Sequence, residues 1–143
     1  MDAKTILNRK GRTVHTVSPS ATIREAMALL LRHSVGSLLV VDNDGEVLGI
    51  VSERDIVRAV AREGVAALSH TARDLMTAEL VTVSPATSVA EGLAIMTQRR
   101  CRHLPVMEHG KLAGMVSIGD LVKARIEQAE QEAESLRAFV TAA

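Results

Sequence analysis

The sequence predicts an α/β fold of two pseudo-symmetric β-α-β-β-α repeats, followed by a long C-terminal helix. The main observation is an internal duplication. Residues 14–19, Val-His-Thr-Val-Ser-Pro, return as Leu-Val-Thr-Val-Ser-Pro at 80–85, an offset of 66 from Pro19 to Pro85. Residues 49–55 return as 114–120 once one residue has been lost in the intervening turn. A match over this length with a single gap indicates a repeat, in which each copy is one supersecondary unit.

Each copy carries the same signals in the same order. Thr22 and Glu25 in copy one, like Ser88 and Glu91 in copy two, have capping-box spacing, which predicts a helix start at each. Apolar residues at helical spacing follow, and then two short apolar segments joined by a polar turn predict a β-hairpin. The expected strands are 14–17, 37–41 and 47–51 in copy one and 80–83, 103–107 and 112–116 in copy two, and the closing helices begin near Ser52 and Ser117.

Two half-sized units with open apolar faces would stabilise each other by packing together. We set repeat 1 at residues 10–66, repeat 2 at 74–130 and a C-terminal helical extension at 121–143. In the extension, apolar residues recur at alternating steps of four and three: Val122, Ile126, Ala129, Ala133, Leu136 and Val140. This narrow seam, flanked by glutamates, is typical of packing against a partner helix, and equally of an amphipathic helix that lies on its own domain.

The composition excludes several classes of protein. The 17 Lys and Arg residues balance the 17 Asp and Glu residues, so no charge excess points to nucleic acid. No apolar run approaches the roughly 18 residues of a membrane span, and the first residues lack the apolar core of a signal peptide. The single cysteine, Cys101, forms no internal disulfide, which fits a reducing cytoplasm. With no Trp or Tyr, a bound base must be held by aliphatic and backbone groups rather than by aromatic stacking.

The repeated pattern Gly-x-x-Ser-x-x-Asp, at residues 49–55 and 114–120, resembles the cystathionine-β-synthase (CBS) domain family in its tandem arrangement. Residues 74–77, Asp-Leu-Met-Thr, and 102–106, Arg-His-Leu-Pro-Val, are also similar to segments of that family. The resemblance covers roughly residues 10–126. It implies a disc-like pair with two clefts that bind AMP, ADP, ATP, NAD-type dinucleotides or S-adenosylmethionine, and a homodimer of four repeats.

The chemistry of Ser-x-x-Asp can be argued from the residues themselves. A helix N-terminus offers unpaired backbone N–H groups and positive dipole character, which suit a phosphate. A serine there adds a hydroxyl, and the aspartate offers two acceptor oxygens to a ribose diol. The resemblance gives these roles to Ser52 and Asp55 in copy one and to Ser117 and Asp120 in copy two. The alternative is structural: the serine caps the helix and the aspartate favours the helix dipole.

The resemblance also supplies the remaining site candidates. Arg102 and His103 would face the phosphates in the cleft of Asp120. Copy one has the uncharged Gly36 at the position of Arg102. In the cleft of Asp55, positive charge would come from Arg54 instead. Because these charges differ, the two clefts should not be equivalent. The adenine pockets should draw on the opposite repeat, with aliphatic candidates Val35, Ile50, Met115 and Cys101, and with backbone edges from Met76 and Thr77 near Asp55 and from Lys10 and Gly11 near Asp120.

No catalytic set is visible, since the histidines are scattered and Cys101 has the aliphatic Val35 as its counterpart. We therefore expect a regulatory module rather than an enzyme, which senses energy or redox state by binding an adenine nucleotide. AMP is the first expectation, with NAD(H), ADP and ATP as further ligands and no metal. We expect a cytoplasmic homodimer that acts on an unknown downstream protein, with no nucleic-acid or membrane partner. The alternative function is a protein-interaction scaffold with vestigial clefts.

Overall fold

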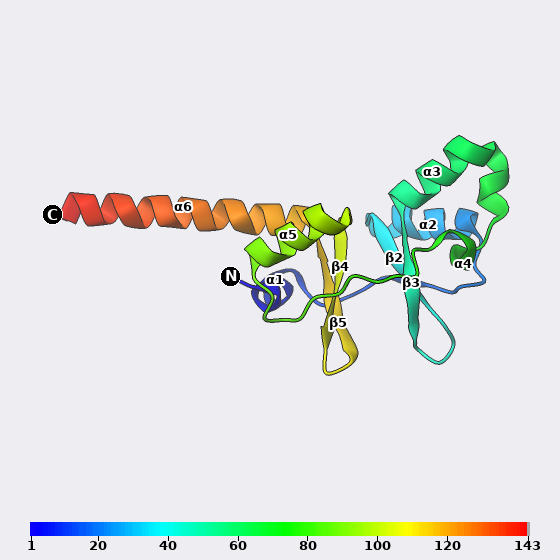
Figure 1. The fold of residues 1–143 in the computed structure, drawn as a ribbon, viewed down its shortest axis with the longest axis horizontal. Helices are drawn as coiled ribbons and strands as arrows, with labels where there is room; N and C mark the ends of the chain where they lie inside the picture. Colours follow the sequence, from blue (N-terminus) through cyan, green and yellow to red (C-terminus); the bar gives the residue numbers. More distant parts are fainter. Residues whose placement is uncertain (143) are drawn as a thin grey trace. The chain divides into compact units, whose positions relative to one another are not determined.

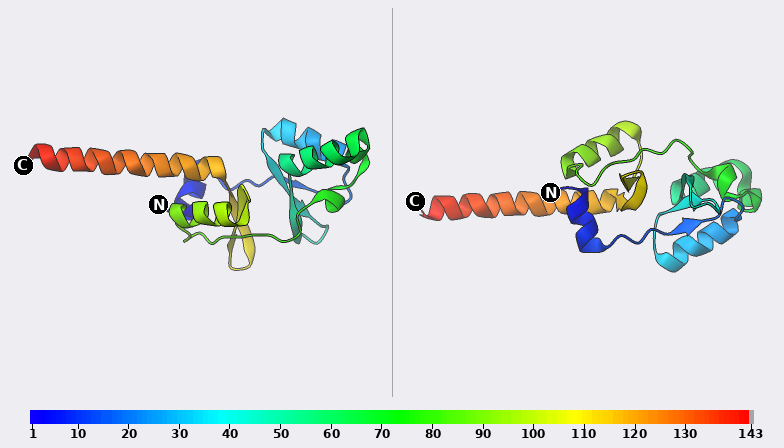
Figure 2. Two further views of the ribbon diagram at one scale, coloured as in Figure 1. Left: turned by 45° about the horizontal axis from the view of Figure 1, so that its top comes forward. Right: turned by 90° about the horizontal axis from the view of Figure 1, so that it is seen from below.

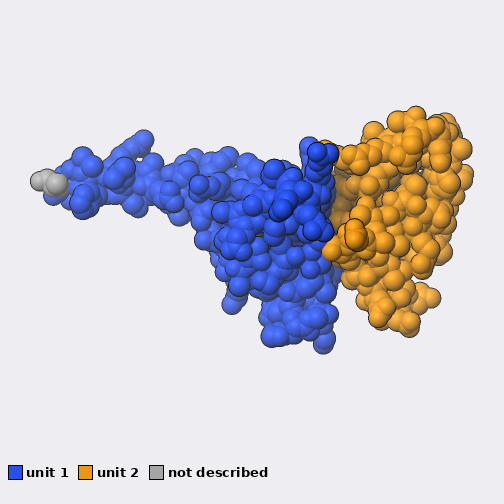
Figure 3. All heavy atoms as spheres, in the orientation of Figure 1, with its two compact units in different colours: residues 1–13, 81–143 blue, residues 14–80 orange. Residues whose placement is uncertain are grey.

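The computed structural model describes residues 1–142, which divide into two compact units (Figure 3). Unit 2 is the continuous stretch 14–80. Unit 1 combines residues 1–13 with the chain from residue 81 onward. The two units contain the same types of element in mixed α/β layers, and each is described by itself.

Unit 2 is built on a three-stranded sheet whose strand order is β1-β2-β3 (Figure 1). The strand β1 runs parallel to β2, and β2 pairs with β3 as the predicted antiparallel hairpin. Buried apolar side chains from the sheet and its helices, among them Ile23, Leu38 and Val51, form one core. The elements are β1 (Thr16–Val17), α2 (Ile23–His33), β2 (Ser37–Val41), β3 (Val47–Ser52), α3 (Glu53–Glu63), the 3-10 helix η1 (Gly64–Ser69) and α4 (Ala72–Leu75).

Unit 1 repeats this plan around a two-stranded hairpin. Its strands β4 and β5 are antiparallel, with His103 opposite Ser117. Its core gathers Leu7 from the N-terminal helix with Leu104 and Val116 from the hairpin and Leu121 from the last helix. The elements are α1 (Ala3–Lys10), α5 (Val89–Arg99), β4 (His103–Glu108), β5 (Lys111–Ser117) and α6 (Ile118–Ala142).

The strand predicted at 80–83 does not form, and only an isolated parallel bridge joins Val83 to Val106. In unit 2 the corresponding strand is held partly by the Leu39 N–H, which donates to the His15 carbonyl at 3.1 Å. The repeat places Pro105 at the position of Leu39, and proline has no N–H to donate. The prediction of a first strand in copy two was therefore wrong because one ladder hydrogen bond cannot be made.

Two helices that the sequence did not predict, α1 and α4, dock in the same way in the two units. Ala72 and Arg73 of α4 donate their N–H groups to the carbonyls of Ala21 and Pro19. In unit 1 the donors are Ala3 and Lys4 of α1, and the acceptors are Thr87 and Pro85. Each helix precedes one repeat in the sequence but packs with the other: α1 with repeat 2, and α4 with repeat 1. The compact units are thus not the sequence repeats.

The last helix, α6, has 25 residues and runs out from the body of unit 1 (Figures 1 and 2). Its buried residues, Leu121 and Ala124, both lie in its first two turns. Residues 131–142 are all exposed. None of the helices formed by residues 1–142 has the length and apolar character to cross a bilayer.

Candidate functional site

In unit 2 the Ser-x-x-Asp segment forms a complete capping box at the start of α3. The Ser52 N–H and hydroxyl both donate to Oδ2 of Asp55, at 2.9 and 3.0 Å. The Asp55 N–H donates in return to the Ser52 hydroxyl at 3.3 Å. The structural role considered for these two residues is therefore realised, since together they satisfy two otherwise unpaired backbone groups.

Unit 1 repeats the arrangement where β5 runs into α6. The Ser117 N–H donates to Oδ2 of Asp120 at 2.8 Å, and the Asp120 N–H donates to the Ser117 hydroxyl at 3.2 Å. The hydrogen bonds from Lys10, Ser52 and Ser117 to these two aspartates all go to Oδ2. Both carboxylates are half-buried and held rigidly by one oxygen. Since Oδ1 takes no part in the cap, capping and ligand binding are compatible.

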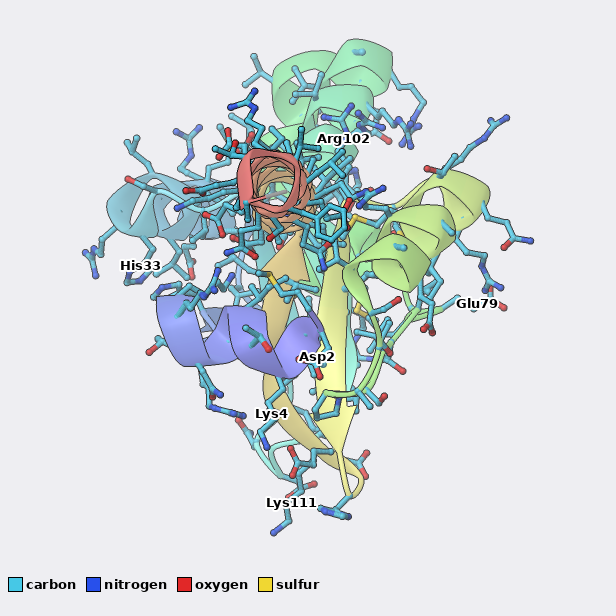
Figure 4. All side chains as sticks on the ribbon, turned by 90° about the vertical axis from the view of Figure 1, so that its left-hand side faces the viewer. Asp2, Lys4, His33, Glu79, Arg102 and Lys111 are labelled. Atoms are coloured by element: carbon cyan, nitrogen blue, oxygen red, sulfur yellow. The ribbon has the colours of Figure 1, made fainter. Side chains whose placement is uncertain are left out.

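A lysine distinguishes the site of unit 1. Lys10, at the end of α1, places its ammonium 2.7 Å from Oδ2 of Asp120, and these side chains are 37% and 25% exposed. Burial raises the pKa of Asp120, but the Lys10 hydrogen bond, the Ser117 N–H and the Lys10 charge outweigh it, so the pKa lies below 3.8. Figure 4 looks along α6 and shows α1 beside it, with Asp2 just before the helix and Lys4 in its first turn. Asp120 is therefore a fixed anion with a cation already in place.

The predicted residues of copy one gather around the junction of β3 and α3. The Gly36 carbonyl accepts the Glu53 N–H at 3.0 Å, which brings Gly36 to the first turn of α3. Ile50 and Thr77 exchange two backbone hydrogen bonds, of 3.1 and 2.8 Å. The Thr77 N–H is thus already committed, and only the second lone pair of its carbonyl could meet a base. Val35 is half-buried on the unit 2 core, and Arg54 is exposed in the first turn of α3.

The predicted residues of copy two lie in the matching place in unit 1. The Arg102 carbonyl accepts the Ile118 N–H at 2.8 Å, so the exposed Arg102 lies at the start of α6. His103 is half-buried and pairs with Ser117 across the hairpin. The half-buried Cys101 packs against the unit 1 core, and Met115 lies opposite Pro105. The backbone contacts of Arg102 with Ile118 and of His103 with Ser117 therefore bring both basic candidates next to the segment that forms the Asp120 capping box.

The structure corrects the residue that matches Met76. The repeat offset of 66 places Lys10 at that position, but the docking hydrogen bonds of α1 and α4 show a different register. A methyl group added at Gly49 would meet Met76, and one added at the equivalent Gly114 would meet Leu7. Leu7 is therefore the counterpart of Met76, and Lys10 follows one turn later, within reach of Asp120. The sequence signal that could have shown this is the pair of hairpin glycines, each of which faces a helix.

The described part of the chain gives little support for a metal site or for a reactive cysteine. Among residues 1–142, no group of three or more His, Cys, Asp and Glu side chains is placed to hold a metal ion. Burial raises the pKa of the Cys101 thiol against the opposing charge of Arg99, so thiolate is disfavoured. The polar geometry that the two units share is the Ser-x-x-Asp capping box, formed by Ser52 and Asp55 in unit 2 and by Ser117 and Asp120 in unit 1.

Comparison with known proteins places this geometry in a family. The sequence model of the CBS domain matches residues 6–62 and 72–127. The chain is 38% identical over 124 residues to the mitochondrial CBS domain-containing protein CBSX3 of Arabidopsis thaliana; the match takes in 83% of this chain but only 60% of that relative. The CBS-domain containing protein ATU1752 of Agrobacterium tumefaciens has a TM-score of 0.85 and 47% identity, over 87% of this chain and 92% of that one. The CBS domain protein PAE2072 of Pyrobaculum aerophilum, whose structure is a complex with AMP, has a TM-score of 0.73 and 29% identity, over 84% and 89%.

Proposed function

The chain belongs to the CBS domain family, and from this membership we propose that it is a regulatory module that binds an adenine nucleotide at its two Ser-x-x-Asp sites. CBS pairs are regulatory modules that bind adenosine ligands. AMP is the first ligand to test, because a relative with 29% identity is a complex with AMP. NAD(H), ADP and ATP follow it.

The observation that carries the proposal is that the carboxylates of Asp55 and Asp120 are held in the same way. In each unit an aspartate is held by Oδ2 through a capping box, and Oδ1 takes no part in that cap. A ribose diol needs such an acceptor, and the adjacent helix N-terminus suits a phosphate. Thr71 and Asp74 form the same kind of cap at α4, so the geometry alone does not single out a site. What distinguishes Ser52–Asp55 and Ser117–Asp120 is that they recur at the same position of both repeats.

The two sites should differ in their preference for charge. The unit 1 site has Lys10 on its aspartate and Arg102 and His103 nearby in the chain. The unit 2 site has Met76 where unit 1 has Leu7, and its nearest candidate cation is the exposed Arg54. We expect more highly phosphorylated ligands to favour the site of Asp120. The aliphatic surroundings of the adenine, a homodimer, a downstream protein and a cytoplasmic location all stay predictions.

Isothermal titration of the whole chain with AMP, ATP, NAD and NADH tests the proposal. Binding of at least one nucleotide below the millimolar range supports it, and no binding of any of them at millimolar concentration rejects it. Asp55→Asn and Asp120→Asn then assign the sites. Asparagine keeps one oxygen for the capping N–H but replaces the other by an NH2 group, which cannot accept a hydrogen bond from a ribose hydroxyl.

Asp44→Asn is the matched control, since this carboxylate is exposed in the β2–β3 turn of unit 2. We expect each site variant to lose one class of binding sites and the control to keep both. Asp120→Asn removes both a carboxylate oxygen and the ion pair with Lys10. Lys10→Met removes the ion pair alone, so a comparison of the two variants shows which loss weakens nucleotide binding. Equal binding by wild type and both asparagine variants would assign the clefts no role and favour the scaffold function.

A further inference from the structure

The exposed apolar seam of α6 is unusual because it is long, regular and uncovered. It contains Val122, Ile126, Ala129, Ala133, Leu136 and Val140. The four large members are 43%, 53%, 64% and 66% exposed. Scattered exposed apolar residues are normal on a protein surface, but a continuous row at alternating spacings of four and three is the pattern of a coiled-coil interface.

The seam faces away from the body of unit 1. The side of α6 that packs on the core carries Leu121 and Ala124, and Glu127 on that side pairs with Arg9 of α1 at 2.8 Å. An α-helix turns by about 100° per residue, so the centre of the seam lies about 150° round the helix from this packed side. The sequence left two interpretations of the seam open, packing against a partner helix or against its own domain. The second interpretation is wrong. The exposed fractions show that unit 1 leaves the seam uncovered.

The charged residues beside the seam are complementary to the same residues on a second, parallel copy of the helix. With Ile126, Ala133 and Val140 at heptad position a, and Val122, Ala129 and Leu136 at d, the flanking g positions include Arg125 and Glu132, and the e positions include Glu130 and Arg137. In a parallel pair, each g residue meets the e residue five places later on the other helix. Arg125 then faces Glu130 of the second copy, and Glu132 faces Arg137. All four contacts in a symmetric dimer are attractive.

An antiparallel pair is disfavoured by the same residues. The alignment that covers the whole seam would place Glu130 opposite Glu130 and Glu132 opposite Glu132, and Lys123 would meet Arg137. Like charges at these positions are repulsive. Among residues 1–142, Arg125, Glu130, Glu132 and Arg137 have no ion-pair partner within the chain, so all four are available.

We infer that α6 joins two copies of this chain as a parallel two-stranded coiled coil. The second copy is the occupant because the seam and its charges match themselves in one register. Alanines at the two central positions allow the helices to approach closely, but they bury little surface. The association through α6 is therefore weak by itself and depends on protein concentration.

Cysteine cross-linking tests this inference independently of any contact elsewhere in the chain. In a Cys101→Val background, Leu136→Cys places a thiol at position d, where parallel helices bring identical residues within disulfide reach. The matched control is Ser135→Cys, the neighbouring residue on the outer face of α6. We expect the cysteine at 136 to form a covalent dimer on mild oxidation on the order of tenfold faster than the control. Equal rates would overturn the coiled coil.

Charge reversal tests the direction. Arg125→Glu or Glu130→Arg alone turns two attractive contacts of the parallel dimer into repulsive ones, so each slows cross-linking at 136. The double variant restores attraction and the wild-type rate. Glu130→Arg does not weaken the isolated helix, because Glu127 and Glu134 lie one turn away from position 130. If the double variant cross-links no faster than the single variants, the parallel register is wrong.

Discussion

Lys10 and Ser117 donate to the same carboxylate oxygen, Oδ2 of Asp120, at 2.7 and 2.8 Å. The contact joins the C-terminal end of α1 to the first turn of α6, two segments far apart in the chain. Beside it, Arg9 and Glu127 form a second ion pair between the same two helices. The site proposed for a nucleotide is thus also a joint between helices, and Lys10 belongs to both.

Removal of the lysine should change the titration of Asp120. In Lys10→Met, burial still disfavours the charged carboxylate while the opposing hydrogen bond and charge are lost, so we expect the pKa of Asp120 to rise. A carbon-detected NMR titration of the carboxylates measures it. Lys4→Met, an exposed position on the same helix, is the control that should leave Asp120 unchanged. An unaltered Asp120 titration in Lys10→Met would show that the ion pair does not persist in solution.

The lowered pKa of Asp120 also predicts a pH dependence of stability. Because the folded-state pKa lies below 3.8, the ionised carboxylate stabilises the fold above that pH, and the contribution is lost as pH falls through the folded-state pKa. The free energy of unfolding of Asp120→Asn, measured with urea, should be below wild type at pH 6. We expect a gap of about 1 kcal/mol or less, since the pair is partly exposed. The gap should narrow below about pH 4; a gap that does not change with pH would contradict the prediction.

Gly49→Ala should be the more damaging of two equivalent substitutions. A methyl group at Gly49 would lie 2.7 Å from the Thr77 carbonyl oxygen, which is backbone and bonded to Ile50. At Gly114 the nearest atom, at 2.6 Å, is the end of the Leu7 side chain, which can rotate. We expect Gly49→Ala to cost about 1–3 kcal/mol and Gly114→Ala to cost less, as measured by thermal unfolding.

Hydrogen exchange provides a local check on that comparison. Protection of the Thr77 amide should fall in Gly49→Ala and stay unchanged in Gly114→Ala, because the Thr77–Ile50 bridge belongs to unit 2 alone. If the two alanine variants lose equal stability and Thr77 stays protected, the close approach at Gly49 is relaxed in solution.

Two left-handed helix ends offer stabilising changes. Ser34 ends α2 at φ 52°, and Arg100 ends α5 at φ 54°. Glycine adopts this conformation without the Cβ penalty, so Ser34→Gly and Arg100→Gly should each raise the free energy of unfolding by about 0.5–1 kcal/mol. Ala94→Gly, at an exposed position inside α5, should instead lower it by about 1 kcal/mol. Chemical denaturation of the three variants checks both signs, and a loss of stability in Arg100→Gly would point to contacts of the arginine side chain.

Cys101 should behave as a packing residue. Because burial raises its pKa, little thiolate is present at neutral pH, and its reaction with a thiol reagent should be slow. Cys101→Val, which copies Val35 of repeat 1, should change the unfolding free energy by less than about 1.5 kcal/mol. An exposed cysteine at position 135 in that background provides the fast reference rate. Reaction of Cys101 at the reference rate would contradict its burial.

The elements that follow from local signals could be predicted from the sequence. Thr22 and Ser88 cap α2 and α5 by accepting the N–H of Glu25 and Glu91, as the capping-box spacing indicates. The two hairpins and the closing helices also form where the apolar patterns place them. Each of these features depends on residues only a few positions apart, which is the range over which a sequence pattern is informative.

The features that could not be predicted depend on distant partners. The short helix α4 has too few residues to show an apolar period, and it is fixed by hydrogen bonds to Ala21 and Pro19, far away in the chain. The register of Leu7 follows from its contact with Gly114, which no spacing along the chain reveals. The repeat could suggest the role of the candidate carboxylates, but it could not show that Oδ2 is the oxygen that accepts the capping hydrogen bond.

The crossed placement of α1 sets an order of events during synthesis. Residues 14–80 hold all of unit 2, so this unit can complete its core as soon as that stretch has left the ribosome. Helix α1 finds its partners Pro85, Thr87 and Gly114 only after about a hundred further residues have emerged. Until then the apolar face of α1 has no native cover, although unit 2 beside it in the chain can already be folded.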